Sequence, residues 1–351
     1  MKIVSLYKFE EKKIDYLVEK GFKEIELDKE LKKVKKVFIK PNLVTDIPQY
    51  IKNGANTDIR IIEAVIKYLT KYNLTIYLGE ADSGTKIKGR KLKQALKLIG
   101  VYKLKKKYKF KIINLTKDKL VQVNIPKAKL LKNLKLGKTI LDCDLIIDLP
   151  KIKTHKYATI TCALKNMFGT IPDPLRIIYH SNIHLAIAEL NKIYYPKTYV
   201  LTDGIIAMEG KGPMFGEAVN LNVLMFSDSM YCNDIVACKI MKLNPNTVEH
   251  LNLVSANLNS RDKKYKLIEH ISLNKISKKF EPSKKNLFMA IEGKLMQHKI
   301  IVKIVYNEWV QKNITYHFRH ILKNLRGGSS KWYIEKPIKE KNKTILIEKN
   351  N

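Results

Sequence analysis

Cysteine pairs at the spacing of metal or cluster sites are missing from this sequence. Its four cysteines are Cys143, Cys162, Cys232 and Cys238, and no two of them form a C-x-x-C pair. This absence argues against an iron-sulfur cluster motif in the chain and against a structural zinc site. Unclustered cysteines are typical of proteins in a reducing compartment, and we therefore expect a cytoplasmic protein.

Long hydrophobic runs are also missing. No stretch approaches the ~18 uninterrupted apolar residues that span a bilayer. The N-terminal segment reaches Lys8 before an apolar signal-peptide core can develop. We expect no contact with a membrane, and nothing in the sequence determines the oligomeric state.

Acidic residues are scarce relative to basic ones: 67 Lys and Arg face 33 Asp and Glu, a net charge of +34. A lysine-rich surface attracts phosphate, so nucleic acid is one candidate partner. The lysines are spread over helices and turns rather than gathered with aromatic residues, which favours a solvated surface. The lysines of residues 91–107, in particular, should be exposed. Residues 151–260 differ, because their ten basic and eight acidic residues leave a charge of only +2.

Strand-like and helix-like segments alternate along the chain. Strands are predicted at 34–42, 74–80, 110–115, within 139–150, at 197–204 and at 220–227, and helices at 57–72, 91–104, 183–193 and 231–242. This alternation predicts an α/β fold with a mainly parallel sheet flanked by helices, in Rossmann-like layers. We assign residues 1–260 to this core. Residues 261–351 form a lysine-rich C-terminal extension, a smaller α or α+β region of unknown role.

Polar residues follow the predicted strands at their carboxyl ends, where open α/β sheets bind ligands. They are Lys40, Asn42, Glu80, Ser83, Lys151, Lys153, Thr154, His155, Asp203, Ser227 and Asp228. A single residue of this kind is more often only a turn former. Five strand ends with such residues favour a site, and we expect all five to converge on one cleft.

The segment 149–174 carries the candidate chemistry. Lys153 and His155 alternate with apolar and small residues, so they share one face of an extended strand. We predict His155, Lys153 and Lys165 as acid/base residues, because Lys and His can transfer protons near neutral pH. Lysines that protect a strand edge are the alternative for Lys153, and a lysine that complements a helix C-terminus is the alternative for Lys165.

The remaining candidates bind either an anion or a metal. Predicted anion ligands are Lys40, Asn42, Ser83, Thr154, Asn166, Arg176 and His180, and predicted metal ligands are Glu80, Asp203 and Glu209. Carboxylates of this kind suit Mg²⁺ or Mn²⁺. His180 and His184 have helical spacing but form a weak metal motif, because Ser181 is a plausible N-cap that leaves His180 outside the helix. Residues 159–169 predict a short helix that Gly169 closes.

The chain resembles the family catalogued as domain of unknown function 362. The matching segments are VFIKPNLV, LGEADSGT, IIDLPKIKTHKYATITCALKNMFGTIP, the spaced RIIYH…H, LTDGIIAMEGKGPMFGE and SDSMYCNDIVACKIM, which together span about residues 34–260. The family's activity is unassigned. Many relatives carry a ferredoxin-like module, which implies redox partnership for those members, but this chain has no such cysteines.

Three hypotheses for the function follow. The first is an intracellular enzyme that acts on a small anionic substrate at the strand ends, with acid/base chemistry next to a carboxylate and a divalent metal as an optional cofactor. The second is a nucleic-acid-binding protein that uses its basic surface. The third is an electron-transfer accessory that partners an iron-sulfur protein.

Overall fold

The computed structural model describes residues 1–84, 89–174, 176–283, 295, 298–305, 307 and 310. The chain divides into two compact units, Met1–Glu308 and Trp309–Asn351. All the helices and strands described below belong to the first unit.

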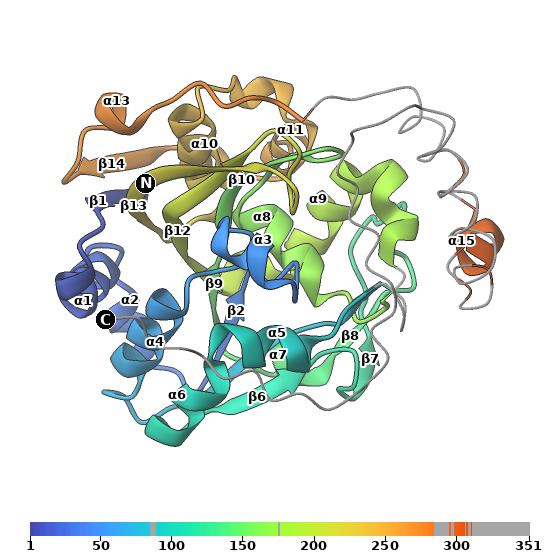
Figure 1. The fold of residues 1–351 in the computed structure, drawn as a ribbon, viewed down its shortest axis with the longest axis horizontal. Helices are drawn as coiled ribbons and strands as arrows, with labels where there is room; N and C mark the ends of the chain where they lie inside the picture. The colour runs from blue at the N-terminus through green and yellow to red at the C-terminus, as the bar shows by residue number, and fades with distance from the viewer. Residues whose placement is uncertain are drawn as a thin grey trace. The chain divides into compact units, whose positions relative to one another are not determined.

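A mixed, mostly parallel sheet of ten strands forms the centre of this unit (Figure 1). Its main path runs β14 (Tyr265–Glu269), β1 (Lys2–Lys8), β13 (Glu217–Ser227), β12 (Thr198–Glu209), β9 (Leu145–Leu149), β2 (Lys36–Pro41), β3 (Thr75–Glu80) and β6 (Lys111–Asn114). β10 (Lys151–His155) pairs with β12, and β11 (Thr159–Thr161) pairs with β10. The predicted α/β class is confirmed.

Helices cover both faces of the sheet (Figure 1). One face carries α1 (Ile14–Glu24), α2 (Leu27–Leu31), α4 (Ile59–Leu69), α5 (Leu92–Ile99) and α6 (Val101–Lys107). The other carries α8 (Ala163–Asn166), α9 (Ile183–Tyr194), α10 (Met230–Ile240) and α11 (Glu249–Ser255). Successive side chains of a strand point to opposite faces of the sheet. Val37 and Ile39 of β2 therefore pack against the first set of helices, and Phe38 packs against the second.

Shorter elements complete the described part of the chain. They are α3 (Pro48–Lys52), α7 (Lys138–Leu141), α12 (Ser260–Lys263), α13 (Leu273–Ile276), α15 (Lys299–Val305), the strands β4 (Ser83–Gly84), β5 (Gly89–Arg90), β7 (Leu120–Gln122) and β8 (Lys135–Gly137), and the 3₁₀ turns η1 (Glu11–Lys13), η2 (Met167–Thr170), η3 (Arg176–Asn182), η4 (Tyr195–Lys197) and η5 (Pro245–Thr247).

Two helix boundaries show the local chemistry. Asp58 caps α4, and its side chain accepts a hydrogen bond from the backbone N–H of Arg60. The helix predicted over 91–104 is two helices, because Gly100 adopts a left-handed conformation with φ of +94°. That conformation ends α5 and starts α6 in a new direction.

One predicted strand end lies at the opposite edge of the sheet. β13 runs antiparallel to β12, and Ser227 pairs with Val200, near the start of β12. Asp228 follows there and accepts a hydrogen bond of 2.7 Å from the backbone N–H of Ile3. The expectation that five strand ends converge is therefore wrong for Ser227 and Asp228, because only strands that run parallel end at the same edge.

The sheet continues past the boundary expected near residue 260. β14 pairs in parallel with β1, so residues 265–269 complete one edge of the core sheet. Most of the remaining C-terminal extension lies outside the described residues.

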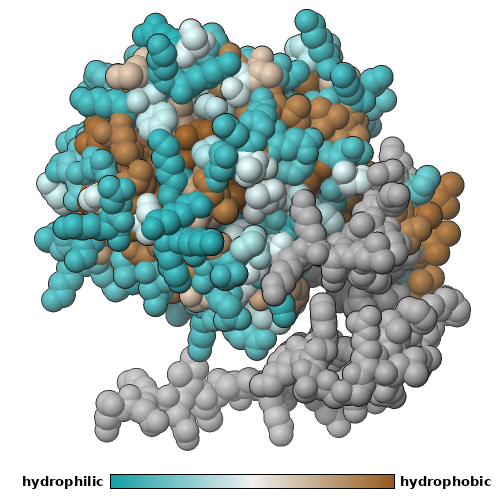
Figure 2. All heavy atoms as spheres, turned by 90° about the horizontal axis from the view of Figure 1, so that it is seen from above, coloured by the Kyte–Doolittle hydropathy of each residue, from teal (hydrophilic) through white to brown (hydrophobic). Residues whose placement is uncertain are grey.

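The basic charge of α5 and α6 lies on the surface, as expected. Lys93, Lys97, Lys103, Lys105, Lys106 and Lys107 are exposed, and Lys91 is half-buried. Figure 2 shows hydrophilic side chains spread over the face that it draws, with hydrophobic groups between them. Within the described ranges, no helix has both the length and the apolar character needed to cross a bilayer.

Candidate functional site

The candidate site begins at the carboxyl ends of β2, β3 and β9. Lys40 and Asp148 are partners in the β2–β9 register, and both are fully buried on the face that α8 covers. Nζ of Lys40 contacts Oε2 of Glu80, at the end of β3, at 2.5 Å. Three neighbouring strands therefore bring one cation and two carboxyl groups together, as the strand-end rule predicts.

Lys40, Lys151 and Lys153 are all buried, with 0%, 1% and 0% exposure, but their partners differ. Lys40 pairs with Glu80, and Lys151 pairs with Asp203 at 2.9 Å. Nζ of Lys153 instead donates to two neutral oxygens.

Those two oxygens are Oδ1 of Asn42 and the carbonyl of Ala55, each at 2.8 Å from Nζ of Lys153. Burial, with repulsion from Lys151, lowers the pKa of Lys153 well below its usual range. Burial therefore disfavours the charged form of Lys153, whose amine is held by two hydrogen bonds to neutral acceptors.

A chain of side-chain amides connects Lys153 to Asp148. Nδ2 of Asn42 donates to Oδ1 of Asn166 at 2.9 Å, and Nδ2 of Asn166 donates to Oδ1 of Asp148 at 2.6 Å. Burial raises the pKa of Asp148 well above its usual range, although Lys40 opposes the shift. Asn42 and Asn166, predicted as ligand-binding residues, are connectors within the protein.

His155 ends β10 and faces a tight turn. Its Nδ1 accepts hydrogen bonds from the backbone N–H groups of Tyr157 at 3.1 Å and Ala158 at 3.0 Å. These bonds leave the proton of the neutral ring on Nε2. Burial, followed by repulsion from Lys165, lowers the pKa of His155 well below its usual range. At neutral pH His155 is a neutral N–H donor.

His180 lies beside His155, with 6.3 Å between the ring centroids. It meets the rings of Tyr157 and Phe168 edge-on, at 5.5 and 5.6 Å. Burial, with Lys165 and Arg176 nearby, lowers the pKa of His180 to about 3. Its Nδ1 is buried without a hydrogen-bond partner, which makes it a polar group available to a ligand.

Lys165, near the end of α8, is half-buried, and its Nζ lies 4.6 Å from the centre of the Phe168 ring. Within the part of the chain that the structure describes, this amine makes no hydrogen bond or ion pair. Burial, with repulsion from Arg176, lowers the pKa of Lys165 to about 7. Arg176 donates to the carbonyl oxygens of Asp82 at 2.6 Å and Ile171 at 3.2 Å.

Arg90, which the sequence analysis missed, completes the cationic group. Its side chain is buried and donates to the carbonyl of Ala81, and its Nη2 lies 4.0 Å from Oε1 of Glu80. Nε and Nη1 of Arg90 are buried without partners. Its signal in the sequence is a lone arginine within a lysine-rich stretch.

Gly169 gives the site its close packing. The predicted helix over 159–169 is instead the strand β11, the short helix α8 and the 3₁₀ turn η2, and Gly169 lies inside that turn. A Cβ atom at this position would collide with Oε1 of Glu80. Glycine is required by that carboxylate and not by a helix end. Similarly, α9 begins at Ile183 after Asn182, so Ser181 is not the N-cap, and His180 lies in η3.

Two predicted anion ligands differ in their position. Oγ1 of Thr154 donates to the carbonyl of Gly210 at 3.1 Å, because Thr154 faces away from Lys153 and His155 on the strand. Ser83 lies in β4, opposite Arg90.

The three predicted metal ligands are also separated. Glu80 pairs with Lys40 and Asp203 with Lys151. Glu209 contacts Lys278 at 3.4 Å and accepts from the backbone N–H of Glu281. Among the residues with described positions, no three or more His, Cys, Asp or Glu could hold a metal ion together. The geometry gives the metal hypothesis no support.

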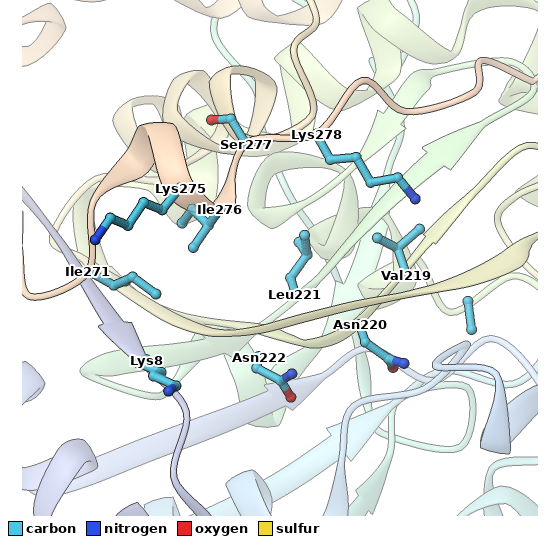
Figure 3. Close-up of a pocket in the computed structure, with 11 residues that line it drawn as sticks. Lys8, Val219, Asn220, Leu221, Asn222, Ile271, Lys275, Ile276, Ser277 and Lys278 are labelled. Carbon is cyan, nitrogen blue, oxygen red and sulfur yellow. The ribbon is translucent and has the colours of Figure 1, made fainter.

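One surface pocket lies away from this cluster. It has a volume of about 460 Å³ and lies between β13 and the segment around α13 (Figure 3). It is lined by Lys8, residues 218–222, Ile271 and residues 275–278. None of the predicted site residues lines it.

Comparison with known proteins identifies the family. The family described as "Domain of unknown function (DUF362)" matches residues 37–239, more than half of the chain. The chain belongs to this family. The match includes β2, β3, β9, β10 and α8, and therefore the whole cluster built around Lys40, Lys153 and Lys165.

The thylakoid-associated protein of Synechocystis sp. is 33% identical over 123 residues, which cover 33% of this chain and 38% of that protein. The chain thus spans less than two fifths of the length of this curated relative. The lactate racemase apoprotein from Thermoanaerobacterium thermosaccharolyticum has a TM-score of 0.42 and 13% identity, over 69% of this chain and 57% of its own. A protein from Thermotoga maritima has a TM-score of 0.41 and 15% identity, over 70% and 59%. Similarities this weak support no statement about function.

Proposed function

We propose that this member of the DUF362 family is an enzyme. It binds a small carboxylate or phosphate anion beside Lys165 and catalyses a proton transfer from or to that anion. The observation that carries the proposal is the state of Lys165. Its amine has no hydrogen-bonded or ion-paired partner among the described residues, and burial, with repulsion from Arg176, lowers its pKa to about 7. An anionic substrate would supply the missing partner.

The surrounding charges favour an anion. Glu80 is the acidic group that interacts electrostatically with all four nearby cations, Lys40, Arg90, Lys165 and Arg176. Of these four, only Lys40 is hydrogen-bonded to Glu80. Burial lowers the pKa of all four cations. A bound carboxylate or phosphate would accept from the guanidinium groups, whose planar donor arrangement matches such anions.

The acid/base roles follow from the protonation states. Lys165, about half neutral near pH 7, can accept a proton from a carbon next to a carboxylate. His155 stays neutral, so its Nε2–H can donate a hydrogen bond to an oxygen that gains negative charge. Lys153 already donates to two neutral acceptors, so we assign it a positioning role: it holds Asn42 and, through Asn42, Asn166.

Binding measurements test the anion site. Thermal shift or calorimetry with lactate, malonate, pyruvate and phosphate should show at least one ligand that stabilises the wild type. Lys165→Gln should weaken that ligand by roughly tenfold or more, about 1.4 kcal/mol. The matched control Lys93→Gln removes an exposed lysine of α5 and should change nothing. Equal affinity in wild type and Lys165→Gln would contradict the proposal.

Proton transfer can be tested without knowing the product. The same carboxylates are incubated with the protein in D₂O, and the signal of the hydrogens next to the carboxylate, or next to the carbonyl group in pyruvate, is followed by NMR. We expect this signal to decay for a true substrate, faster above pH 7 than below, because Lys165 must be neutral to accept the proton. No decay for any carboxylate that binds would contradict the catalytic part of the proposal.

A further inference from the structure

We infer that Lys165 forms a covalent imine with its substrate, and that the substrate is an oxo acid, with a carbonyl group next to its carboxylate. This inference rests on the proposed function and specifies its substrate class. It is carried by the difference between Lys165 and the other lysines of the cluster, and by the groups that surround its amine.

Lys165 alone among the four cluster lysines has an amine free to react. Lys40 and Lys151 are held in ion pairs by Glu80 and Asp203. Lys153 donates two hydrogen bonds and is fully buried. Nζ of Lys165 is not hydrogen-bonded to any described residue, and the side chain retains solvent access. A nucleophilic amine needs this combination of an unoccupied lone pair and an approach for the substrate.

The surroundings of Lys165 keep its amine in the reactive form. The Phe168 ring forms an apolar wall 4.6 Å from Nζ, and Arg176 adds a second positive charge nearby. An apolar wall and a neighbouring cation are the two means by which proteins activate a lysine for imine formation. The same guanidinium is a partner for a carboxylate next to the carbonyl. An oxo acid can therefore present its carbonyl group to the amine of Lys165 and its neighbouring carboxylate to the guanidinium of Arg176.

The imine step balances with groups that are present. The lone pair of Nζ attacks the carbonyl carbon and a C–N bond forms. The C–O bond then breaks, and the oxygen leaves as water with one proton from Nζ and one from solvent. One carbonyl, one neutral amine and one proton thus give one iminium and one water. The Nε2–H group of His155 is available to donate a hydrogen bond to the oxygen as it becomes negative. The iminium then withdraws electrons from the C–H bond on the other side of the former carbonyl carbon. Nζ has given its lone pair to the new bond, so with an oxo acid Lys165 activates this C–H bond as the imine, and the proton passes to solvent.

Reductive trapping tests this inference on the full chain. Pyruvate and sodium cyanoborohydride are added at pH 7, and the modified lysines are mapped by mass spectrometry of peptides. An exposed lysine with a pKa of ≈ 10.4 is only ~0.04% neutral at pH 7, whereas Lys165 is about half neutral. We expect Lys165 to be labelled roughly 100-fold or more ahead of Lys93, the exposed internal reference. Labelling of Lys165 at the rate of Lys93 would overturn the inference.

Two variants and one further ligand separate the possible failures. Lys165→Arg keeps a cation without a nucleophilic amine and should bind pyruvate but give no adduct at position 165; Lys93→Arg should leave the Lys165 adduct unchanged. Lactate, which has no carbonyl group, should bind in thermal-shift measurements and compete with labelling. If lactate and pyruvate both bind through Lys165 and no adduct forms there, the imine is wrong and the proposed function stands. If neither anion binds the wild type and Lys165 is not trapped, both are wrong.

Discussion

Nζ of Lys153 donates a hydrogen bond of 2.8 Å to Oδ1 of Asn42, a neutral acceptor, whereas Nζ of Lys40 pairs with the carboxylate of Glu80. Both lysines are buried in the sheet. The two buried lysines therefore differ in the charge of their acceptors and in what their removal leaves behind. Loss of Lys40 leaves the carboxylate of Glu80 buried without its partner. Loss of Lys153 leaves two neutral oxygens without a donor.

Replacement by methionine should separate these two roles. Lys40→Met should lower the free energy of unfolding by about 3–5 kcal/mol, because it leaves the buried carboxylate of Glu80 without its hydrogen-bonded cation and with only Arg90 4.0 Å away. Lys153→Met should cost about 1–3 kcal/mol, the range for buried acceptors without a partner. Urea denaturation near pH 7 measures both. Equal losses would contradict this distinction between a charged and a neutral acceptor.

The packing of Gly169 against Glu80 gives a second prediction. Gly169→Ala should cost about 1–3 kcal/mol, since the new methyl group collides with Oε1 of Glu80 and the buried ion pair must shift. The backbone at Gly169 is not in the left-handed region, so the penalty comes from this collision alone. In a Glu80→Ala background the same change should cost much less. A double-mutant cycle measures the difference, and strictly additive costs would contradict the explanation.

Much of the site could be predicted from the sequence because strand ends in a parallel sheet share an edge. Lys40, Glu80 and Lys153 were found in this way, and the structure brings them together. The rule fails for Ser227, because the direction of β13 depends on its partner and not on its own residues. It fails for Thr154 because neighbouring residues of a strand point to opposite faces, and the sequence does not show which face holds the site.

Other parts of the site left only weak signals. Asp148 lies in the strand predicted within residues 139–150, and a carboxylate inside an apolar run indicates a buried polar group that needs a partner. The chain of amides from Asn42 to Asn166 connects residues 124 positions apart. A contact of that separation depends on the tertiary fold, which periodicity and turn chemistry do not determine.

The turn after His155 yields a third prediction. Oδ1 of asparagine can take the place of Nδ1, which accepts from the backbone N–H groups of Tyr157 and Ala158, but asparagine has nothing in the position of Nε2. His155→Asn should therefore keep most of the stability and lose proton-transfer activity. His155→Ala should lose both, with a stability cost of about 1–3 kcal/mol. Denaturation and the D₂O exchange assay check these outcomes, and an unstable but fully active His155→Asn variant would contradict them.

Lys165 should impose a pH dependence on stability at alkaline pH. Its folded pKa of about 7 lies below the unfolded value, so the unfolded chain binds more protons between about pH 7 and 10.4. Below pH 7 Lys165 lowers the free energy of unfolding by its full amount. This loss becomes smaller as the pH rises towards the pKa of lysine in the unfolded chain. Relative to Lys165→Met, wild-type stability should increase by up to about 1.4 kcal/mol per pH unit in this window. Parallel stability curves for the two proteins would show that Lys165 titrates normally.

A pair of histidines between α9 and α11 should govern stability at acid pH. Nδ1 of His184 lies 3.1 Å from Nδ1 of His250 and accepts from the backbone N–H of His250 at 3.1 Å. Nε2 of His184 lies 3.9 Å from Glu249, and Nε2 of His250 is buried without a partner. Burial, with repulsion from His184 and Lys165, lowers the pKa of His250 well below its usual range.

The folded protein thus keeps His250 neutral where the unfolded chain becomes protonated. Its contribution to stability is complete above the unfolded pKa of ≈ 6.5 and is lost as the pH falls below that value, by up to about 1.4 kcal/mol per pH unit. His250→Phe removes this titration and should make stability less dependent on pH between about 6.5 and 4.5, whatever the substitution costs at neutral pH. Asp234, whose pKa burial raises to about 6, acts in the opposite direction in both proteins and cancels in the difference. Urea denaturation of wild type and variant across this range measures the difference directly, and curves that stay parallel down to pH 4.5 would show that His250 is protonated in the folded protein as readily as in the unfolded chain.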